Sequence, residues 1–459
     1  TISYPHPGWV EQDANEIWLA CLAVMSEVIL KSKISPEQVA AIGISNQRET
    51  SVLWDASTGL PVSPAIVWQS KQTKSICDGW KKKGYEDIVK AKTGLRIDPY
   101  FSASKIRFIF DQNPDVYEKA KKGEVLFGTM DSWIVWKLSG SLTHITDVSN
   151  ASRTLLFNIH TLSWDDELLE MFDIPKCILP QVKPTSYAYC KTAAYHFFGQ
   201  EVPICCVVGD QQAALFGQGC FGAGGIKNTY GTGGFMLMNT GKRIVESKNG
   251  LLSTVAWQIG DQVDYALEGS IFVSGSLMKW LRDQMQLFEN TKDTQAMAES
   301  VENTNGVYIV PAFVGLGAPY WDDACQASIL GLTFGANKNH IVRAALESMA
   351  YQSKDVLEAM RQDSQINITS MKVDGGACAN DFLLQFQSDL LQMPVQRFKT
   401  NELTALGAAC LAGLSCGYWT KDELGVELSK EFVPEKSKEE MDSLYSSWKK
   451  AVKTCQSYK

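Results

Sequence analysis

Residues 202–216 read VPICCVVGDQQAALF, and this stretch decides the fold class. Its first half is a run of mostly apolar residues that ends at Gly209, which is typical of a strand buried on both faces. Polar residues follow at 210–212, and the last four residues begin a helical segment. A buried strand, a polar tip and a helix in this order predict an α/β protein.

The same order occurs at two further places in the chain. A strand is predicted over residues 40–45 and ends in the polar segment 46–50. Another strand is predicted over 370–374, and it runs through two glycines into a helical segment at 380–386. Because ligands of open α/β sheets bind beyond the carboxyl ends of strands, these polar tips are the places to look for a site.

A glycine-rich stretch at 217–225 lies near the middle of the 459-residue chain and is the predicted domain boundary. It leaves two halves of similar size that both have the α/β pattern. We therefore expect a first domain at residues 1–217 and a second at 218–459. This division agrees with the roughly two or three domains that the length admits.

The composition argues against several classes of protein. The chain has 43 Lys and Arg against 51 Asp and Glu, a formal net charge of −8, which disfavours a nucleic-acid or anionic-membrane partner. No apolar stretch approaches the ~18 residues of a membrane span, and the start has no signal-peptide pattern. The 12 cysteines lack a C-x-x-C motif, and the 5 histidines lack metal-ligand spacing. We expect a cytoplasmic protein with no dedicated metal site.

Asp210 is the strongest candidate for a catalytic residue. It stands between an apolar strand and a helix, so its carboxylate is expected at the edge of a cleft. A carboxylate there could accept a proton from an attacking hydroxyl. The alternative is that Asp210 only caps the helix, as aspartate often does.

Two glycine clusters indicate a phosphate or nucleotide site. Residues 228–235 read NTYGTGGF, a turn in which backbone N–H groups can approach phosphate oxygens without Cβ clashes. Gly375 and Gly376 precede a helix, whose positive end favours an anion. Each cluster could instead be an ordinary hairpin or strand-to-helix turn. Neither fits the P-loop or the dinucleotide-binding pattern.

Arg48 and Glu49 place a guanidinium beside a carboxylate, a pair suited to holding several hydroxyls of a polyol. A surface ion pair is the alternative. Tyr100 follows the turn-forming Asp98-Pro99 and could direct its hydroxyl into a cleft, whereas Trp68 could equally be a core residue. From the residues alone, the chain is a two-domain α/β protein with a candidate cleft for a nucleotide and a polyol.

Longer blocks resemble the glycerol kinases of the FGGY carbohydrate-kinase family, in the actin/hexokinase-like ATPase superfamily. The resemblance runs essentially from Pro5 to the C-terminus. It implies two actin-like ATPase (ribonuclease H-like) domains with a catalytic cleft between them, and phosphorylation of glycerol to sn-glycerol 3-phosphate. The blocks that carry it are IGISNQRET at 42–50, NASRTLLFN at 150–158, GDQQAALFGQ at 209–218, NTYGTG at 228–233, PAFVGLGAPYWD at 311–322 and VDGGACAN at 373–380.

The resemblance also implies roles for the matched positions. Asp210 would be the general base, and the chemistry would be in-line phosphoryl transfer from ATP with Mg²⁺. The implied glycerol-binding residues are Arg48, Glu49, Trp68, Tyr100, Asp210, Gln211 and Phe235. The implied nucleotide-binding residues are Thr232, Gly275, Lys279, Gly375, Gly376 and Asn380, although many relatives carry glutamine where Lys279 stands.

The resemblance also implies partners and regulation. The loop YHFFGQE at 195–201 is similar to the loop that is phosphorylated on histidine in some bacterial glycerol kinases, so His196 is a candidate phosphohistidine. Its partner would be the phosphocarrier protein of the sugar phosphotransferase system. Because these kinases commonly form dimers or tetramers, we expect a homodimer or homotetramer.

The start of the sequence departs from the family pattern. Glycerol kinases begin with a strand, a D-Q-G-T-T-type phosphate loop and a returning strand, whereas this sequence begins after that element. We therefore expect a first domain without its N-terminal strand-loop-strand and doubtful activity of this exact polypeptide. Two alternatives stay open: a non-catalytic remnant that binds glycerol or nucleotide, and another FGGY sugar kinase that acts on a pentulose or hexonate.

Overall fold

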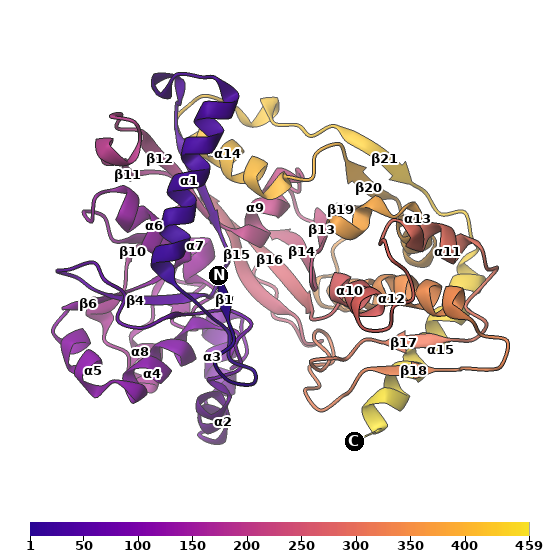
Figure 1. The fold of residues 1–459 in the computed structure, drawn as a ribbon. Helices are drawn as coiled ribbons and strands as arrows, with labels where there is room; N and C mark the ends of the chain where they lie inside the picture. Colours follow the sequence, from indigo (N-terminus) through magenta and orange to yellow (C-terminus); the bar gives the residue numbers. More distant parts are fainter. Residues whose placement is uncertain (459) are drawn as a thin grey trace.

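A ten-stranded sheet passes through both halves of the chain in the computed structural model, which describes residues 1–458 (Figure 1). Strands from the first half occupy one end of the sheet, and strands from the second half occupy the other. In spatial order they are β21 (Leu428–Phe432), β20 (Val395–Phe398), β19 (Met371–Gly375), β13 (Ile226–Tyr230), β14 (Gly234–Gly241), β16 (Gln262–Ile271), β15 (Leu252–Ile259), β11 (Ser186–Lys191), β12 (Pro203–Gly209) and β3 (Ile42–Asn46).

The strands predicted from apolar runs are confirmed as β3, β12 and β19, and the segment after β12 is the predicted helix α9 (Asp210–Gly217). β3 and β12 are parallel neighbours, and Gly209 pairs with Asn46 at their carboxyl ends. β13 and β19 are also parallel, with Tyr230 opposite Gly375. The polar tips that follow each pair therefore meet at one edge of the sheet.

The two halves of the sheet join between β11 and β15 through one register pair, Ser186 with Ile259. By contrast, β14 and β16 pair over seven register positions within the second half. The junction is also narrower than its neighbours, since β11 and β12 pair at three positions and β15 and β16 at seven.

A second sheet of five strands and most of the first-half helices complete the first half. The strand order is β1 (Ile2–Ser3), β2 (Glu11–Gln12), β5 (Ala65–Ile66), β4 (Ser51–Asp55) and β6 (Val125–Thr129). The helices are α1 (Ala14–Ser32), α2 (Lys74–Lys82), α3 (Glu86–Thr93), α4 (Ser102–Gln112), α5 (Pro114–Lys121), α6 (Met130–Leu138), α7 (Val148–Ala151) and α8 (Asp166–Phe172). Short strand pairs are β7 (Ile145–Asp147) with β10 (Gln181–Lys183), and β8 (Phe157–Asn158) with β9 (Ser163–Trp164).

The second half packs its helices around α12 (Lys338–Ser364), most of which is buried. Tyr351 of α12 stacks on Trp448 of α15 (Lys438–Ser457), with ring centroids 5.3 Å apart. The remaining elements are α10 (Gly275–Asp283), α11 (Asp293–Glu299), α13 (Asp381–Leu391), α14 (Leu403–Ser415), and the strand pair β17 (Tyr308–Val310) with β18 (Ser328–Leu330). Within residues 1–458, no helix has both the length and the apolar character that a membrane crossing needs.

Helix α14 returns to the first half and packs against α9 (Figure 1). The backbones approach so closely that only glycine fits at the contact. A Cβ on Gly407 would lie 1.9 Å from the carbonyl oxygen of Ala213, and one on Gly217 would lie 2.0 Å from that of Leu403. This contact fixes the position of α9, and α9 begins at Asp210.

Candidate active site

Arg48 and Asp210 meet at the tips of the parallel strands β3 and β12. Arg48 Nε lies 3.4 Å from Asp210 Oδ1. Asp210 is the first residue of α9, whose N-cap is Gly209, so the alternative that Asp210 is itself the N-cap is wrong. Its side chain is 35 % exposed, so its carboxylate is accessible at this edge of the sheet.

Arg48 is held by a dense set of acceptors. Its two Nη groups donate to Glu268 Oε2 at 2.6 Å and Oε1 at 3.0 Å, which makes a bidentate pair. They also donate to Gln212 Oε1 at 3.2 Å and to the Tyr100 hydroxyl at 3.3 Å. Arg48 and Glu49 are 3 % and 1 % exposed, so the alternative of a surface ion pair is wrong.

Glu49 has a φ of +60°, a backbone conformation that non-glycine residues rarely adopt and that clusters at functional sites. Arg153 Nε donates to Glu49 Oε1 at 2.7 Å. Burial raises the pKa of Glu49 above its ordinary value, although the charges of Arg48 and Arg153 oppose this rise. Glu49 is thus anchored by a second arginine.

Sequence reasoning missed Glu268 and Arg153 as members of the site. Arg153 Nη2 donates to Glu268 Oε1 at 2.8 Å, and both side chains are completely buried. The signal available for Glu268 was a charged residue directly after the apolar run Tyr265-Ala266-Leu267 of β16, since a buried glutamate requires a partner. Arg153 lies inside a block already noted, but nothing local indicated its partners.

Gln211 lies between Asp210 and a buried lysine. Gln211 Nε2 donates to Asp210 Oδ2 at 3.1 Å, and Gln211 Oε1 accepts a hydrogen bond from Lys227 Nζ. Lys227 also donates to Thr229 Oγ1 at 2.8 Å and to the carbonyl of Phe235 at 3.1 Å. Burial lowers the pKa of Lys227 to about 8, with Asp374 and Asp210 opposing the shift. These bonds fix the amide of Gln211 beside the carboxylate.

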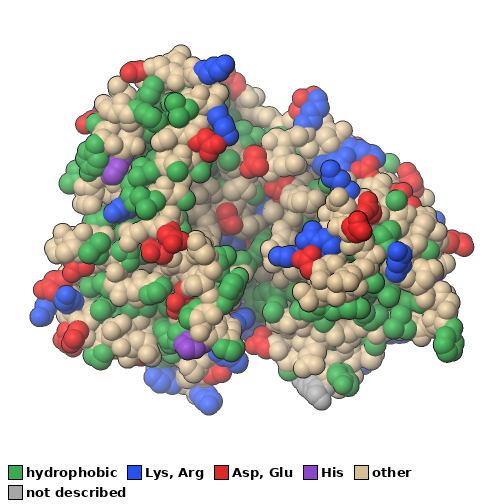
Figure 2. Space-filling model, in the orientation of Figure 1, with side chains coloured by type: hydrophobic (Ala, Val, Ile, Leu, Met, Phe, Trp, Pro, Cys, Tyr) green, Lys and Arg blue, Asp and Glu red, His purple; other side chains and the backbone are tan. Residues whose placement is uncertain are grey.

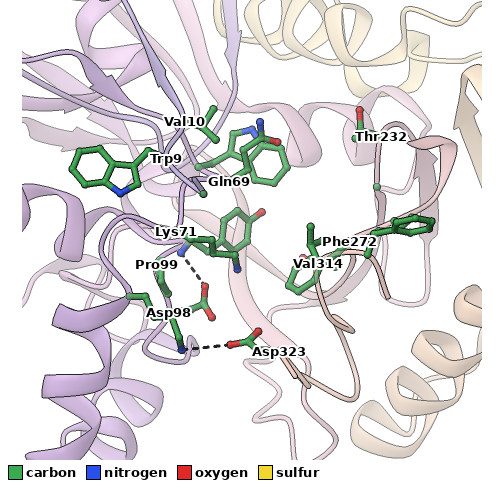
Figure 3. A pocket seen from close by; sticks show the side chains of 18 of the residues that line it. Trp9, Val10, Gln69, Lys71, Asp98, Pro99, Thr232, Phe272, Val314 and Asp323 are labelled. Carbon is green, nitrogen blue, oxygen red and sulfur yellow. Dashed lines mark hydrogen bonds and ion pairs between the residues drawn. The ribbon is translucent and has the colours of Figure 1, made fainter. Parts of the chain in front are cut away.

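Aromatic rings from both halves line a cavity of about 1040 Å³ next to this group. Trp68 lies edge-on to Tyr100 and to Phe235, with centroid distances of 5.7 and 5.9 Å. All three line the cavity, so Trp68 is not simply a core residue. Figure 3 shows Trp9 and Pro99 on one side of the cavity, with Thr232 and Phe272 on the other. Figure 2 shows the molecule hollowed between its two lobes on this face.

The two glycine clusters lie at neighbouring strand ends. Residues 231–233 connect β13 to β14 as a hairpin, and Thr232 lines the cavity. Gly275 N donates to the Gly231 carbonyl at 3.0 Å, which brings the start of α10 against this loop. Gly375 has a φ of +95°, and a Cβ there would lie 2.2 Å from the Tyr230 carbonyl. Glycine is therefore required at position 375, where β19 lies against Tyr230 at the end of β13.

Residues 1–217 match the N-terminal domain, and residues 226–416 the C-terminal domain, of the FGGY family of carbohydrate kinases. The chain belongs to this family. It is 57 % identical over 460 residues to a glycerol kinase of Geobacillus sp. (strain WCH70), covering 99 % of this chain and 92 % of that protein. It is 56 % identical over 460 residues to the glycerol kinase of Bacillus subtilis (strain 168), with the same coverage.

Solved structures of FGGY kinases share the fold. The crystal structure of Plasmodium falciparum glycerol kinase with ADP matches with a TM-score of 0.92 and 36 % identity, covering 99 % of this chain and 92 % of that chain. Gluconate kinase from Lactobacillus acidophilus matches with a TM-score of 0.88 at 20 % identity, covering 100 % of this chain and 92 % of that chain, which shows the fold alone. The expected two-domain actin-like architecture is confirmed.

The other predicted nucleotide residues of this FGGY chain lie around the same loops. Gly375 and Gly376 line a second cavity of about 620 Å³, together with Arg397 and Lys399. Asn380 caps α13, since its Oδ1 accepts from Leu383 N at 3.0 Å. Lys279 is an exposed residue of α10.

His196 lies apart from the cleft, in the short 3₁₀ helix Ala194–His196. Its ring lies edge-on to that of Trp18 in α1, with centroids 4.9 Å apart. Burial and the nearby charge of Lys137 lower the pKa of His196. The neighbouring Tyr195 is 74 % exposed, so the segment is at the surface.

Across residues 1–458, the His, Cys, Asp and Glu side chains form no group of three or more that could hold a metal ion. Asp374, just before Gly375, is 6 % exposed, and its Oδ1 has no hydrogen-bond partner among these residues. Burial raises the pKa of Asp374. A buried carboxylate oxygen without a partner is suited to a cation that arrives with a ligand.

Proposed function

We propose that this FGGY chain is a glycerol kinase, which transfers the γ-phosphoryl group of ATP to glycerol and yields sn-glycerol 3-phosphate and ADP. The observation that carries the proposal is the 56–57 % identity to glycerol kinases over nearly the whole chain. The site agrees with it, because charged and amide side chains stand beside an aromatic wall, as a small polyol requires.

Asp210 is the general base in this proposal. Its carboxylate, which is 35 % exposed, accepts the proton of the attacking hydroxyl, and Arg48 Nε lies 3.4 Å from its Oδ1. Arg48, Glu49, Tyr100 and Gln211 bind the glycerol hydroxyls. Trp68 and Phe235 contact its carbon skeleton. Placing the hydroxyl in line with the phosphoryl group supplies most of the rate enhancement.

The nucleotide belongs at the glycine clusters, where Thr232, Gly275, Gly375, Gly376, Asn380 and Lys279 are the proposed contacts. The glycines at 231, 233, 375 and 376 have no side chains to block the phosphates. Mg²⁺ is proposed to come with ATP, since this ion is usually held by one or two carboxylates together with substrate phosphates. The unpartnered oxygen of Asp374 fits such an ion. When bound, Mg²⁺ would neutralise phosphate charge.

Glycerol-dependent ADP formation tests the proposal. The purified chain is mixed with Mg-ATP and glycerol, xylulose or gluconate, and ADP is measured by a coupled assay. We expect ADP release with glycerol and little with the other two substrates. Preference for xylulose or gluconate, or ATP consumption that does not depend on the added substrate, would overturn it.

Three finer proposals accompany the kinase. We propose that His196 accepts a phosphoryl group from the phosphocarrier protein, which is supported by its place on a surface segment. Labelling with phosphoenolpyruvate and the phosphotransferase proteins should mark wild type and not His196→Ala.

We also propose a homodimer or homotetramer, which light scattering would detect. Since ATP is supplied in the cytoplasm, we propose that the enzyme acts there, and fractionation checks this.

A further inference from the structure

Two arginines and two glutamates form a connected group at the proposed glycerol site, and we call Arg48, Arg153, Glu49 and Glu268 the buried charge cluster. All four are at most 3 % exposed. Glu268 accepts from Arg48 at 2.6 and 3.0 Å and from Arg153 at 2.8 Å. Arg153 in turn donates to Glu49 at 2.7 Å.

Glu268 links the two halves of the molecule through this cluster. It lies on β16, whereas its two arginine partners lie in residues 1–217. Both of its carboxylate oxygens are occupied by arginine, and Ser270 Oγ adds a hydrogen bond at 3.3 Å. Burial opposes ionisation of Glu268, but the charges of Arg153 and Arg48 prevail and lower its pKa to about 2. Glu268 is therefore negatively charged at neutral pH.

The cluster and its neighbours determine which donors of Arg48 are engaged. The Nη groups of Arg48 are engaged with Glu268, Gln212 and Tyr100. Its Nε makes no hydrogen bond within residues 1–458, and it lies 3.4 Å from Asp210 Oδ1 and 3.8 Å from Glu49 Oε1. The donor that is free for a substrate hydroxyl is thus the one beside the proposed base.

We propose that Glu268 and Arg153 are positioning residues for glycerol: Glu268 orients Arg48, and Arg153 orients Glu49. This inference rests on the proposed function and assigns to a carboxylate of the second half the orientation of an arginine of the first half. With two positive and two negative charges, the cluster is neutral as a set. Removing one carboxylate leaves an uncompensated buried arginine, which is free to turn its donors elsewhere.

The test is Glu268→Gln, which keeps the shape of the side chain and removes its charge. We expect kcat/KM for glycerol to fall about tenfold or more, as for loss of a charge-assisted hydrogen bond. The KM for ATP should stay within about twofold, because the cluster does not contact the glycine loops. If Glu268 were only structural, Glu268→Gln would lower thermal stability, and the KM for glycerol would not change more than the KM for ATP.

Glu347→Gln is the matched control. Glu347 is also buried, at 4 % exposure, and accepts from Arg343 Nε at 2.9 Å on α12, outside the cavity. We expect it to lose stability and to keep the glycerol KM of wild type. A folded Glu268→Gln enzyme with wild-type glycerol kinetics would overturn the inference.

Arg153→Lys and Arg153→Met cover the case in which Glu268→Gln does not fold. Where Glu268→Gln folds, its combination with Arg153→Met restores neutrality, so we expect the double variant to lose less activity than the product of the two single losses. Arg153→Lys should be less impaired than Arg153→Met. Wild-type kinetics in both Arg153 variants, or purely multiplicative losses, would contradict the inference. If the wild-type enzyme prefers a sugar substrate to glycerol, the proposed function fails. The kinetics of the same variants with that sugar would still decide whether Glu268 and Arg153 are positioning residues.

Discussion

Gly407→Ala is expected to disable catalysis from a position that touches no substrate. The added Cβ would lie 1.9 Å from the carbonyl oxygen of Ala213, whereas ordinary contact begins at 3.4 Å. Helices α14 and α9 must therefore separate by about 1.5 Å, and Asp210 stands one turn before Ala213 in α9. Because a misplacement of about 1 Å can cost about 100-fold in rate, we expect kcat to fall by roughly two orders of magnitude.

Stability should change less than activity in this variant. Overpacking costs about 1–3 kcal/mol, whereas replacing a helical glycine with alanine returns about 1 kcal/mol. The matched control is Gly79→Ala in α2, where an added Cβ meets nothing within 4 Å. Steady-state kinetics with glycerol and urea unfolding measure both effects. Gly407→Ala with the kcat and the unfolding midpoint of wild type would refute the argument.

Three further predictions follow from individual residues. Asp210→Asn should keep glycerol affinity by calorimetry and lose about 10²–10⁴ in kcat, and near-normal turnover would remove Asp210 as the base. Burial lowers the pKa of His144 to about 4, so the unfolded chain binds an extra proton between about pH 4 and 6.5, and acidification through this window removes stability. His144→Gln should flatten this loss in urea unfolding at several pH values, and an unchanged slope would contradict the assignment. Gly375 has a φ of +95°, and a Cβ at this position would lie 2.2 Å from Tyr230 O. Gly375→Ala should therefore displace the glycine turn and raise the KM for ATP well above that of wild type, and an unchanged KM would place the nucleotide elsewhere.

Much of the fold and part of the site could be predicted from local sequence. The apolar run before Asp210 predicted β12, and the polar tips of β3 and β12 marked Arg48 and Asp210 as candidate site residues. These features are local, or follow from the rule that parallel strand ends share an edge. The identity of the substrate could not be predicted in this way. The residues alone indicated a polyol and a nucleotide, and only the resemblance to the family indicated glycerol.

The partners of Arg48 could not be predicted, because they are set by tertiary packing. Glu268 is 220 residues away in the chain, and Arg153 is 104 residues from Glu49. The close contact of Gly407 with Ala213 has the same origin, since each glycine looks ordinary within its own helix. Burial of Arg48 and Glu49 also depended on packing, and it removed the alternative of a surface ion pair.

The link between Arg48 and Glu268 limits how this enzyme can be recombined. The two FGGY domains are contiguous in sequence and look like exchangeable modules. Yet Arg48 of the first domain is bound by Glu268 of the second. A gene fusion across the domain boundary therefore keeps this pair only if one parent supplies the arginine and the other supplies the glutamate. Chimaeras between distant FGGY kinases should therefore work when an acidic residue stands at position 268 and fail when it does not, which makes the two halves a single unit of inheritance.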